Sequence, residues 1–173
     1  FMVIATQSPI EFQGVFPLPE VLVDRFLMRL GVGYPSASEE IQLTDRAYLL
    51  DSKRPKQVAS AEQISYLSEL ARTVYIAPQV QSYIVDVTRR TREMESVSLG
   101  ASPRASIALT KTSRSRALIN GRVYVVPDDV KYLAARVLEH RLVPSALARS
   151  QQLPVKSMIE SLLQETPIPK KPT

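Results

Sequence analysis

Repeated helix-start signals from residue 36 onward constrain the fold more than any other feature of this sequence. Two pairs have the spacing of a capping box, Ser36 with Glu39 and Ser60 with Gln63. Three prolines stand where a first helical turn favours proline: Pro78, Pro103 and Pro127. Apolar residues then recur every three to four positions, which predicts helices over about 36–50, 60–74, 78–87, 102–120, 127–138 and 155–162. We therefore expect a bundle of five or six helices without an internal repeat.

The first 35 residues have a different pattern. The run 1–5 is continuously apolar and predicts a strand buried on both faces of a parallel sheet. A short helix is expected to begin at Pro19-Glu20, and residues 28–34 read as a second short strand. The predicted fold class is therefore mainly α, with residues 1–35 forming the end of an α/β domain and residues 36–173 forming a helical domain.

Composition excludes several kinds of chemistry. The chain contains no cysteine and only one histidine, His140. A disulfide framework, a thiolate nucleophile and a cysteine-based zinc site are therefore excluded. One histidine by itself makes neither a metal cluster nor a catalytic triad, so we expect no bound metal cluster in this chain, and we expect His140 to be structural.

The charge balance favours an anionic partner. Lys and Arg number 22 against 17 Asp and Glu, which gives a net charge of +5. A nucleotide, a nucleic acid and an acidic protein surface all suit such a chain. There is no apolar run long enough to span a membrane and no leader pattern, so we expect a cytoplasmic protein.

Two nucleotide-binding signatures are absent from the sequence. No G-x-x-x-x-G-K-[ST] loop occurs, and no apolar strand ends in Asp-Glu. The loop would cradle phosphates and the acidic pair would hold a metal ion. We therefore expect the chain, taken alone, to be inactive in nucleotide hydrolysis.

Three segments nevertheless carry a specific resemblance, in the order ATQSPIEFQGVFPLPEVLVDRF (5–26), GASPRASIAL (100–109) and GRVYVVPDDVKYLAARVLEHRL (121–142). Together they resemble the MoxR family of AAA+ ATPases, and the similarity runs from about residue 1 to residue 169. The resemblance implies that the chain is the C-terminal half of such an ATPase. Residues 1–35 would end the α/β P-loop core, and residues 36–173 would form the all-helical lid; the Walker A and Walker B segments are not in this chain.

The resemblance places Ser8 at the sensor 1 position. In the family this residue is an Asn that positions the attacking water near the γ-phosphate. Serine can donate and accept a hydrogen bond, but its side chain is shorter than that of Asn. In the alternative interpretation, Ser8 only ends the strand before the turn at Pro9.

Arg25 matches the arginine finger, which acts in trans on a neighbouring subunit's site. A planar guanidinium stabilises the negative charge that phosphoryl transfer spreads over the γ-oxygens. The alternative is an ion pair of Arg25 with Asp24 or Glu20 on a solvated helix face.

Arg104 matches sensor 2 and, with Ser102 and Pro103, would contact the nucleotide. A cation opposes the dipole at a helix N-terminus, unless an anion binds at the same end. The alternative is a surface pairing of Arg104 with Glu93 or Glu95. The basic residues farther along this helix are expected to form a solvated or intersubunit face: Lys111, Arg114 and Arg116.

By resemblance, the intact protein would use ATP and Mg²⁺ to drive chaperone-like remodelling or maturation of partner proteins. It would form a homo-oligomeric ring, a hexamer in the family, and work with a protein that carries a von Willebrand factor A domain. A second hypothesis is a non-catalytic basic helical module that binds an acidic protein or nucleic acid. Nucleic acid is the weaker choice, since aromatic residues make up only 6% of the chain and do not alternate with basic ones.

Overall fold

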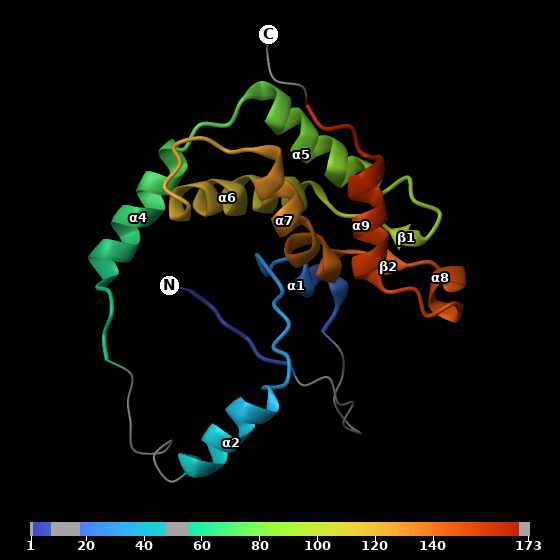
Figure 1. Ribbon diagram of the computed structural model, residues 1–173. Helices are drawn as coiled ribbons and strands as arrows, with labels where there is room; N and C mark the ends of the chain where they lie inside the picture. The colour runs from blue at the N-terminus through green and yellow to red at the C-terminus, as the bar shows by residue number, and fades with distance from the viewer. Residues whose placement is uncertain (1, 8–17, 48–55, 170–173) are drawn as a thin grey trace.

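The structure is a computed structural model that describes residues 2–7, 18–47 and 56–169 (Figure 1). The described chain is mainly helical, so the predicted fold class is confirmed. Its helices are α1 (Glu20–Val23), α2 (Ala37–Asp45), α4 (Ala61–Thr73), α5 (Pro78–Arg90), α6 (Pro103–Ile119), α7 (Pro127–Leu138), the 3-10 turn η1 (Glu139–Arg141), α8 (Ala146–Ser150) and α9 (Val155–Glu165). Within these residues, no helix has both the length and the apolar character that crossing a membrane requires.

Both predicted capping boxes are formed. The Ser36 backbone N–H donates to Glu39 Oε2 at 2.8 Å, and the Ser60 backbone N–H donates to Gln63 Oε1 at 2.8 Å. The predicted prolines occupy the first turns of α5, α6 and α7. Local sequence signals therefore set where these helices begin.

The core lies between α5, α6, α7 and α9, which pack against one another (Figure 1). Their fully buried large side chains include Tyr83, Ile84, Leu109, Leu138 and Ile159. Full burial of one such aliphatic or aromatic side chain stabilises a fold by about 1.5–3 kcal/mol. This packed body is the frame on which the candidate site is built.

The predicted strands at residues 1–5 and 28–34 are not formed in the part of the chain that the structure describes. Residues 2–5 and 28–34 are extended without a strand partner, and the Arg29 N–H donates to the Arg136 carbonyl near the end of α7 (2.8 Å). A strand needs the backbone of a neighbouring strand, and none of the described residues supplies one here. The strand prediction was therefore wrong for these two segments.

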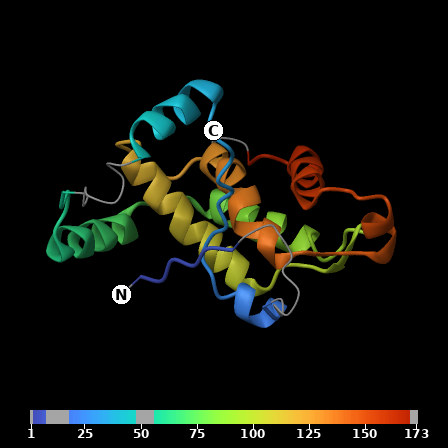
Figure 2. The same ribbon diagram turned by 90° about the horizontal axis from the view of Figure 1, so that it is seen from below.

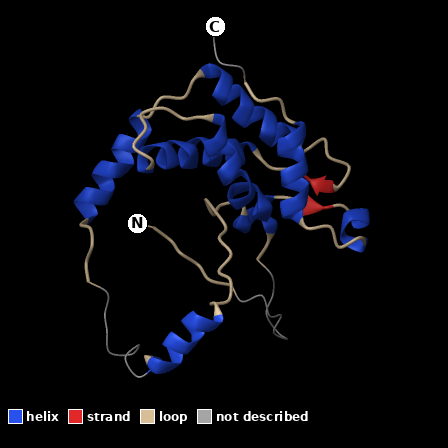
Figure 3. Cartoon of the chain, viewed as in Figure 1, coloured by secondary structure: helices blue, strands red, loops and turns tan. Residues whose placement is uncertain are grey.

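Two short strands lie elsewhere, where the sequence pattern did not predict them (Figure 3). β1 (Val97–Leu99) pairs antiparallel with β2 (Val143–Pro144). The Ser145 N–H also donates to the Ser96 carbonyl at 2.9 Å. The pair thus joins the segment just before α6 to the segment just after η1.

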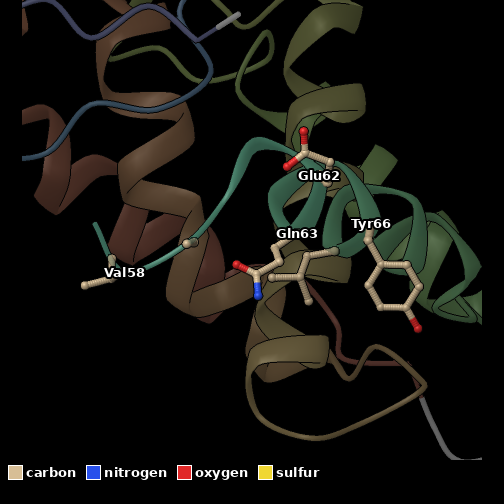
Figure 4. Close-up of a pocket in the computed structure, with 6 residues that line it drawn as sticks. Val58, Glu62, Gln63 and Tyr66 are labelled. Atoms are coloured by element: carbon tan, nitrogen blue, oxygen red, sulfur yellow. The ribbon is translucent and has the colours of Figure 1, made fainter. Parts of the chain in front are cut away.

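Helices α2 and α4 lie at the periphery in both views (Figures 1 and 2) and contribute no buried side chain. On α4, Ile64 is 55% exposed and Leu67 is 48% exposed, although both belong to the apolar stripe seen in the sequence. An open hollow runs along this helix (Figure 4), lined by Val58, Ala59, Glu62, Gln63, Tyr66 and Leu67. None of these residues is among the predicted site residues.

Candidate arginine site around Asp24

Helix α1 ends in a tight turn that exposes Arg25. Asp24 is the C-cap of α1, and the Arg25 N–H donates to the Leu22 carbonyl at 3.1 Å. The Arg25 side chain is exposed and forms no ion pair with any described residue. The alternative pairing of Arg25 with Asp24 or Glu20 is therefore not formed.

Arg141 holds this turn from the body of the molecule. Its side chain is only 1% exposed, and its Nε donates to Asp24 Oδ1 at 3.0 Å. Its two terminal nitrogens donate to four backbone carbonyls, those of Asp24, Phe26, Leu27 and Val137. Burial lowers the pKa of Arg141, whereas its hydrogen bond to Asp24 acts in the opposite direction. One buried guanidinium thus ties the turn after α1 to the end of α7 and gives donors to the carbonyls of that turn.

His140 contacts the same turn. Its Nε2 lies 3.0 Å from the Phe26 carbonyl oxygen, and because a carbonyl only accepts, Nε2 carries the proton. Burial lowers the pKa of His140, and the neighbouring cations Arg141 and Arg29 lower it further. This contact agrees with the structural role expected for His140.

Two residues at the N-terminus of α6 also contact Asp24. Ser102 Oγ donates to Asp24 Oδ2 at 3.0 Å and makes no cap hydrogen bond to its own helix. Arg104 Nε lies 3.4 Å from the same Oδ2, and the Arg104 side chain stays 56% exposed. Among the described ion pairs, Arg104 contacts Asp24 and neither Glu93 nor Glu95. Pro103, at the first helical position, is exposed.

Gly100 fixes where α6 begins, because the chain passes very close to the segment after α5 at this point. A Cβ at Gly100 would lie 2.6 Å from the Arg92 Cα. Arg92 Nε donates to the Ala101 carbonyl at 2.9 Å, and the Ala101 N–H donates to Thr91 Oγ1 at 3.0 Å. Only glycine allows this approach, which sets the position of Ser102 and Arg104.

We call the group Asp24, Ser102, Arg104 and Arg141 the Asp24 junction. It brings Arg104 next to Asp24, which directly precedes Arg25 in the chain. Ser8, the predicted sensor 1 residue, lies outside the described residues. The sequence did not single out Asp24 as the shared partner or Arg141 at all. Their contacts join residues 78 and 117 positions apart, for which no local spacing gives a signal.

A second carboxylate that faces arginines lies between the start of α7 and the end of α6. Asp129 is 2% exposed and accepts two hydrogen bonds from Arg122, at 2.8 and 2.6 Å, and one from the Val126 N–H at 3.0 Å. Arg116 Nε lies 3.3 Å from Asp129, and the Arg116 guanidinium stacks 3.4 Å above the Tyr132 ring. We call Asp129, Arg122 and Arg116 the Asp129 junction. Arg116, predicted to lie on a solvated or intersubunit face, thus pairs with Asp129 of its own chain and remains 32% exposed.

The pKa of Asp129 reflects two opposing effects. Burial raises this pKa, but hydrogen bonds from Arg122 and Val126 and the nearby charge of Arg116 outweigh burial. The pKa of Asp129 is lowered as a result, and the carboxylate stays ionised. This junction is a structural ion cluster, since its polar atoms are turned toward one another.

Two protein-family models match separate parts of the chain. Residues 89–161 match the AAA lid domain family, and residues 1–28 match the family of ATPases associated with various cellular activities. The first match contains Arg104, Arg141 and the Asp129 junction, and the second contains Asp24 and Arg25. The chain is thus similar to an AAA lid domain over residues 89–161 and to an AAA ATPase domain over residues 1–28.

Individual similar proteins narrow the family to which the chain is related. The chain is 38% identical to the chaperone MoxR1 of Mycobacterium tuberculosis over 178 residues, which is 98% of this chain and 47% of that protein. It is 36% identical to the protein YeaC of Bacillus subtilis, over 98% of this chain and 53% of that protein. A crystal structure of a candidate ATPase from Cytophaga hutchinsonii has a TM-score of 0.86 at 28% identity, and covers 95% of this chain and 53% of that chain.

These similarities confirm the resemblance that the motifs indicated: the chain is a relative of the MoxR proteins among the AAA+ ATPases. It spans about half the length of the curated relatives it matches. The activity, substrates and partners of a whole MoxR protein are therefore taken up below as proposals.

Proposed function

We propose that this chain is the C-terminal part of a MoxR-type ATPase that couples ATP hydrolysis to the remodelling or maturation of partner proteins. Residues 1–35 close the nucleotide-binding core, and residues 36–173 form the lid. Arg25 is the arginine finger and acts in trans on a neighbouring subunit. Arg104, with Ser102 and Pro103, forms the sensor 2 region, and Ser8 stands at the sensor 1 position.

One observation carries the proposal: Arg25 and Arg104 are both exposed, and the residue next to both of them is held by hydrogen bonds. Arg25 makes no ion pair with any described residue, and Arg104 is more than half exposed. The residue beside both of them, Asp24, is held by Arg141 and Ser102. Placing cations in advance where charge will develop is the main way in which proteins catalyse phosphoryl transfer.

The start of α6 also fits a phosphate group. No side chain caps this helix, and α6 therefore presents an uncapped N-terminus next to Arg104. Helix N-termini bind anions through their free N–H groups and the helix dipole. Mg²⁺ would accompany the bound ATP in this proposal.

The proposal extends to the assembly. An arginine finger that acts in trans requires a homo-oligomer, and we propose a ring of six subunits in the cytoplasm. The client would be a protein with a von Willebrand factor A domain or another protein substrate. The name of the M. tuberculosis relative, chaperone MoxR1, supports a role in protein remodelling.

The test is phosphate release from ATP by the product of the whole reading frame that encodes this chain. We expect hydrolysis, and we expect Arg25→Ala to lower kcat by about 10³-fold or more, as loss of an arginine finger does. Arg89→Ala is the matched control, because Arg89 is exposed on α5 and makes no ion pair with a described residue. If the product neither binds nor hydrolyses ATP, the proposal is wrong and the basic-module hypothesis takes its place.

Mixing two inactive variants determines whether Arg25 and Arg104 of one chain serve the same site. Arg25→Ala protein is mixed with Arg104→Ala protein, and phosphate release is measured after subunit exchange. If activity returns, the two arginines of one chain serve different sites. If it does not, both act on the same site.

A further inference from the structure

The Asp24 junction connects the segments that carry the two exposed arginines, Arg25 and Arg104. The Asp24 carboxylate accepts from Arg141 through Oδ1, and through Oδ2 it accepts from Ser102 and faces Arg104 at 3.4 Å. Arg25 is the next residue in the chain. A shift of the α1 turn therefore moves the partner of Ser102 and Arg104 at the same time.

Arg141 makes this link rigid. It is buried on η1, which follows directly from the core helix α7, and it donates to the carbonyls of Asp24, Phe26 and Leu27. Those carbonyls lie immediately before and after the backbone of Arg25. The Arg141 guanidinium thus holds the backbone on both sides of Arg25, whose side chain forms no ion pair with a described residue.

We propose that Asp24 and Arg141 are positioning residues that hold Arg25 and Arg104 as one unit, so that neither arginine reaches a nucleotide independently of the other. This inference rests on the proposed function, because it assigns the unit to ATP hydrolysis. Neither residue touches the nucleotide in this proposal. Both act through the arginines that they place, and a displacement of about 1 Å at such a group costs up to about 100-fold in rate.

The experiment is a double-mutant cycle in the whole reading-frame product. Asp24→Asn keeps the size of the side chain but removes its charge and one of its two acceptor oxygens. We expect Asp24→Asn to lower kcat by about 10-fold in the otherwise unchanged protein. In an Arg25→Ala background, measured under single-turnover conditions, we expect the same substitution to lower the rate by a clearly smaller factor, since Arg104 is then the only one of its two targets that remains.

Two further variants keep the inference testable if Asp24→Asn lowers the stability of the protein. Ser102→Ala removes the hydrogen bond from α6 to Asp24, and we expect a fall of about 3-fold in kcat that is again smaller in the Arg25→Ala background. Asp86→Asn, which neutralises an exposed carboxylate on α5, is the control expected to keep full activity. Thermal denaturation of each variant shows that the compared proteins are folded.

The outcomes separate this inference from the proposed function. Equal losses from Asp24→Asn with and without Arg25 indicate a purely structural role and overturn the inference, as does full activity of Asp24→Asn. In either case, if Arg25→Ala is inactive, the proposed function still stands. If the unchanged protein does not hydrolyse ATP, or if Arg25→Ala remains active, the proposed function fails and the inference fails with it.

Discussion

The two carboxylates that join arginines in this protein have similar partners but different surroundings. Asp24 and Asp129 each face two arginines and one further donor. Asp129 is 2% exposed and is held mainly by Arg122, seven positions earlier in the chain. Asp24 is 24% exposed, and its partners are Ser102 and Arg141, 78 and 117 positions later.

The difference separates a cluster that supports the fold from one that supports a site. At Asp129, the donors point toward the carboxylate, and the Arg116 and Arg122 side chains are only 32% and 26% exposed. At Asp24, the same kind of bonding leaves Arg104 more than half exposed and Arg25 without a partner among the described residues. Buried ion clusters add little net stability when intact but cost much when one partner is removed. The two clusters should therefore respond differently to the same change.

The largest expected effect is on stability at the Asp129 junction. Asp129→Ala leaves Arg122 and Arg116 without their carboxylate, and we expect it to lower the free energy of unfolding by about 3–5 kcal/mol. We expect Asp24→Ala to lower it by about 2 kcal/mol, because the site is partly solvated and Arg141 keeps its carbonyl acceptors. Urea denaturation of the full chain measures both.

The control for this pair is Asp128→Ala, which removes an exposed carboxylate beside Asp129 and should change the free energy of unfolding by about 0.5 kcal/mol or less. A larger loss at Asp24 than at Asp129 would contradict the comparison, since it would make the partly exposed junction the stronger support of the fold.

The next effect concerns a glycine beside each junction. Gly100→Ala places a Cβ 2.6 Å from the Arg92 Cα, and we expect it to cost about 2 kcal/mol through displacement of the start of α6. Gly121, just before Arg122, has a φ of +69°, and a Cβ added there would meet no atom within 4 Å. Gly121→Ala should therefore cost only about 1 kcal/mol of backbone strain. Thermal denaturation ranks the two, and the opposite order would show that strain exceeds the steric clash.

The smallest effect is a difference in pH response. The folded-state pKa of His140 is lowered by burial from its ordinary value of 6.5, so below pH 6.5 the unfolded chain binds the proton more readily and stability falls as the pH falls. The pKa of Asp129 is also lowered, from 3.8, so stability at that junction is lost only at pH values below about 3.8. Urea denaturation at pH 7, 6 and 5 should show a decline that His140→Gln reduces. An unchanged decline in that variant would assign it to another group.

Much of the helical fold could be predicted from the sequence, because its helices begin with local signals. Ser36 and Ser60 cap as their spacing indicated, and the helices that begin at Pro78, Pro103 and Pro127 start where predicted. The strands could not be predicted in the same way. An apolar run such as 1–5 has the composition of a strand, but whether it forms one depends on a neighbouring strand that no local pattern supplies.

The candidate site was predictable only in part. Arg25, Ser102 and Arg104 followed from a resemblance between motifs, and the structure places Ser102 and Arg104 against the residue that precedes Arg25. Asp24 and Arg141 are joined across 117 positions, and periodicity in a single sequence says nothing about such a contact. The sequence therefore indicated the exposed arginines, Arg25 and Arg104, but not the contact between Asp24 and Arg141 that supports them.

The distance along the chain between Asp24 and its partners also bears on the order of folding. Loop-closure entropy opposes a contact that encloses more than a hundred residues, so this contact forms favourably only once α6, α7 and η1 are already in place. We expect the α1 turn to dock last and to detach first, with hydrogen exchange that is faster at the Phe26 amide than in the core of α7. We therefore expect the segment that carries Arg25 to open at a lower free energy than the core helices α6 and α7.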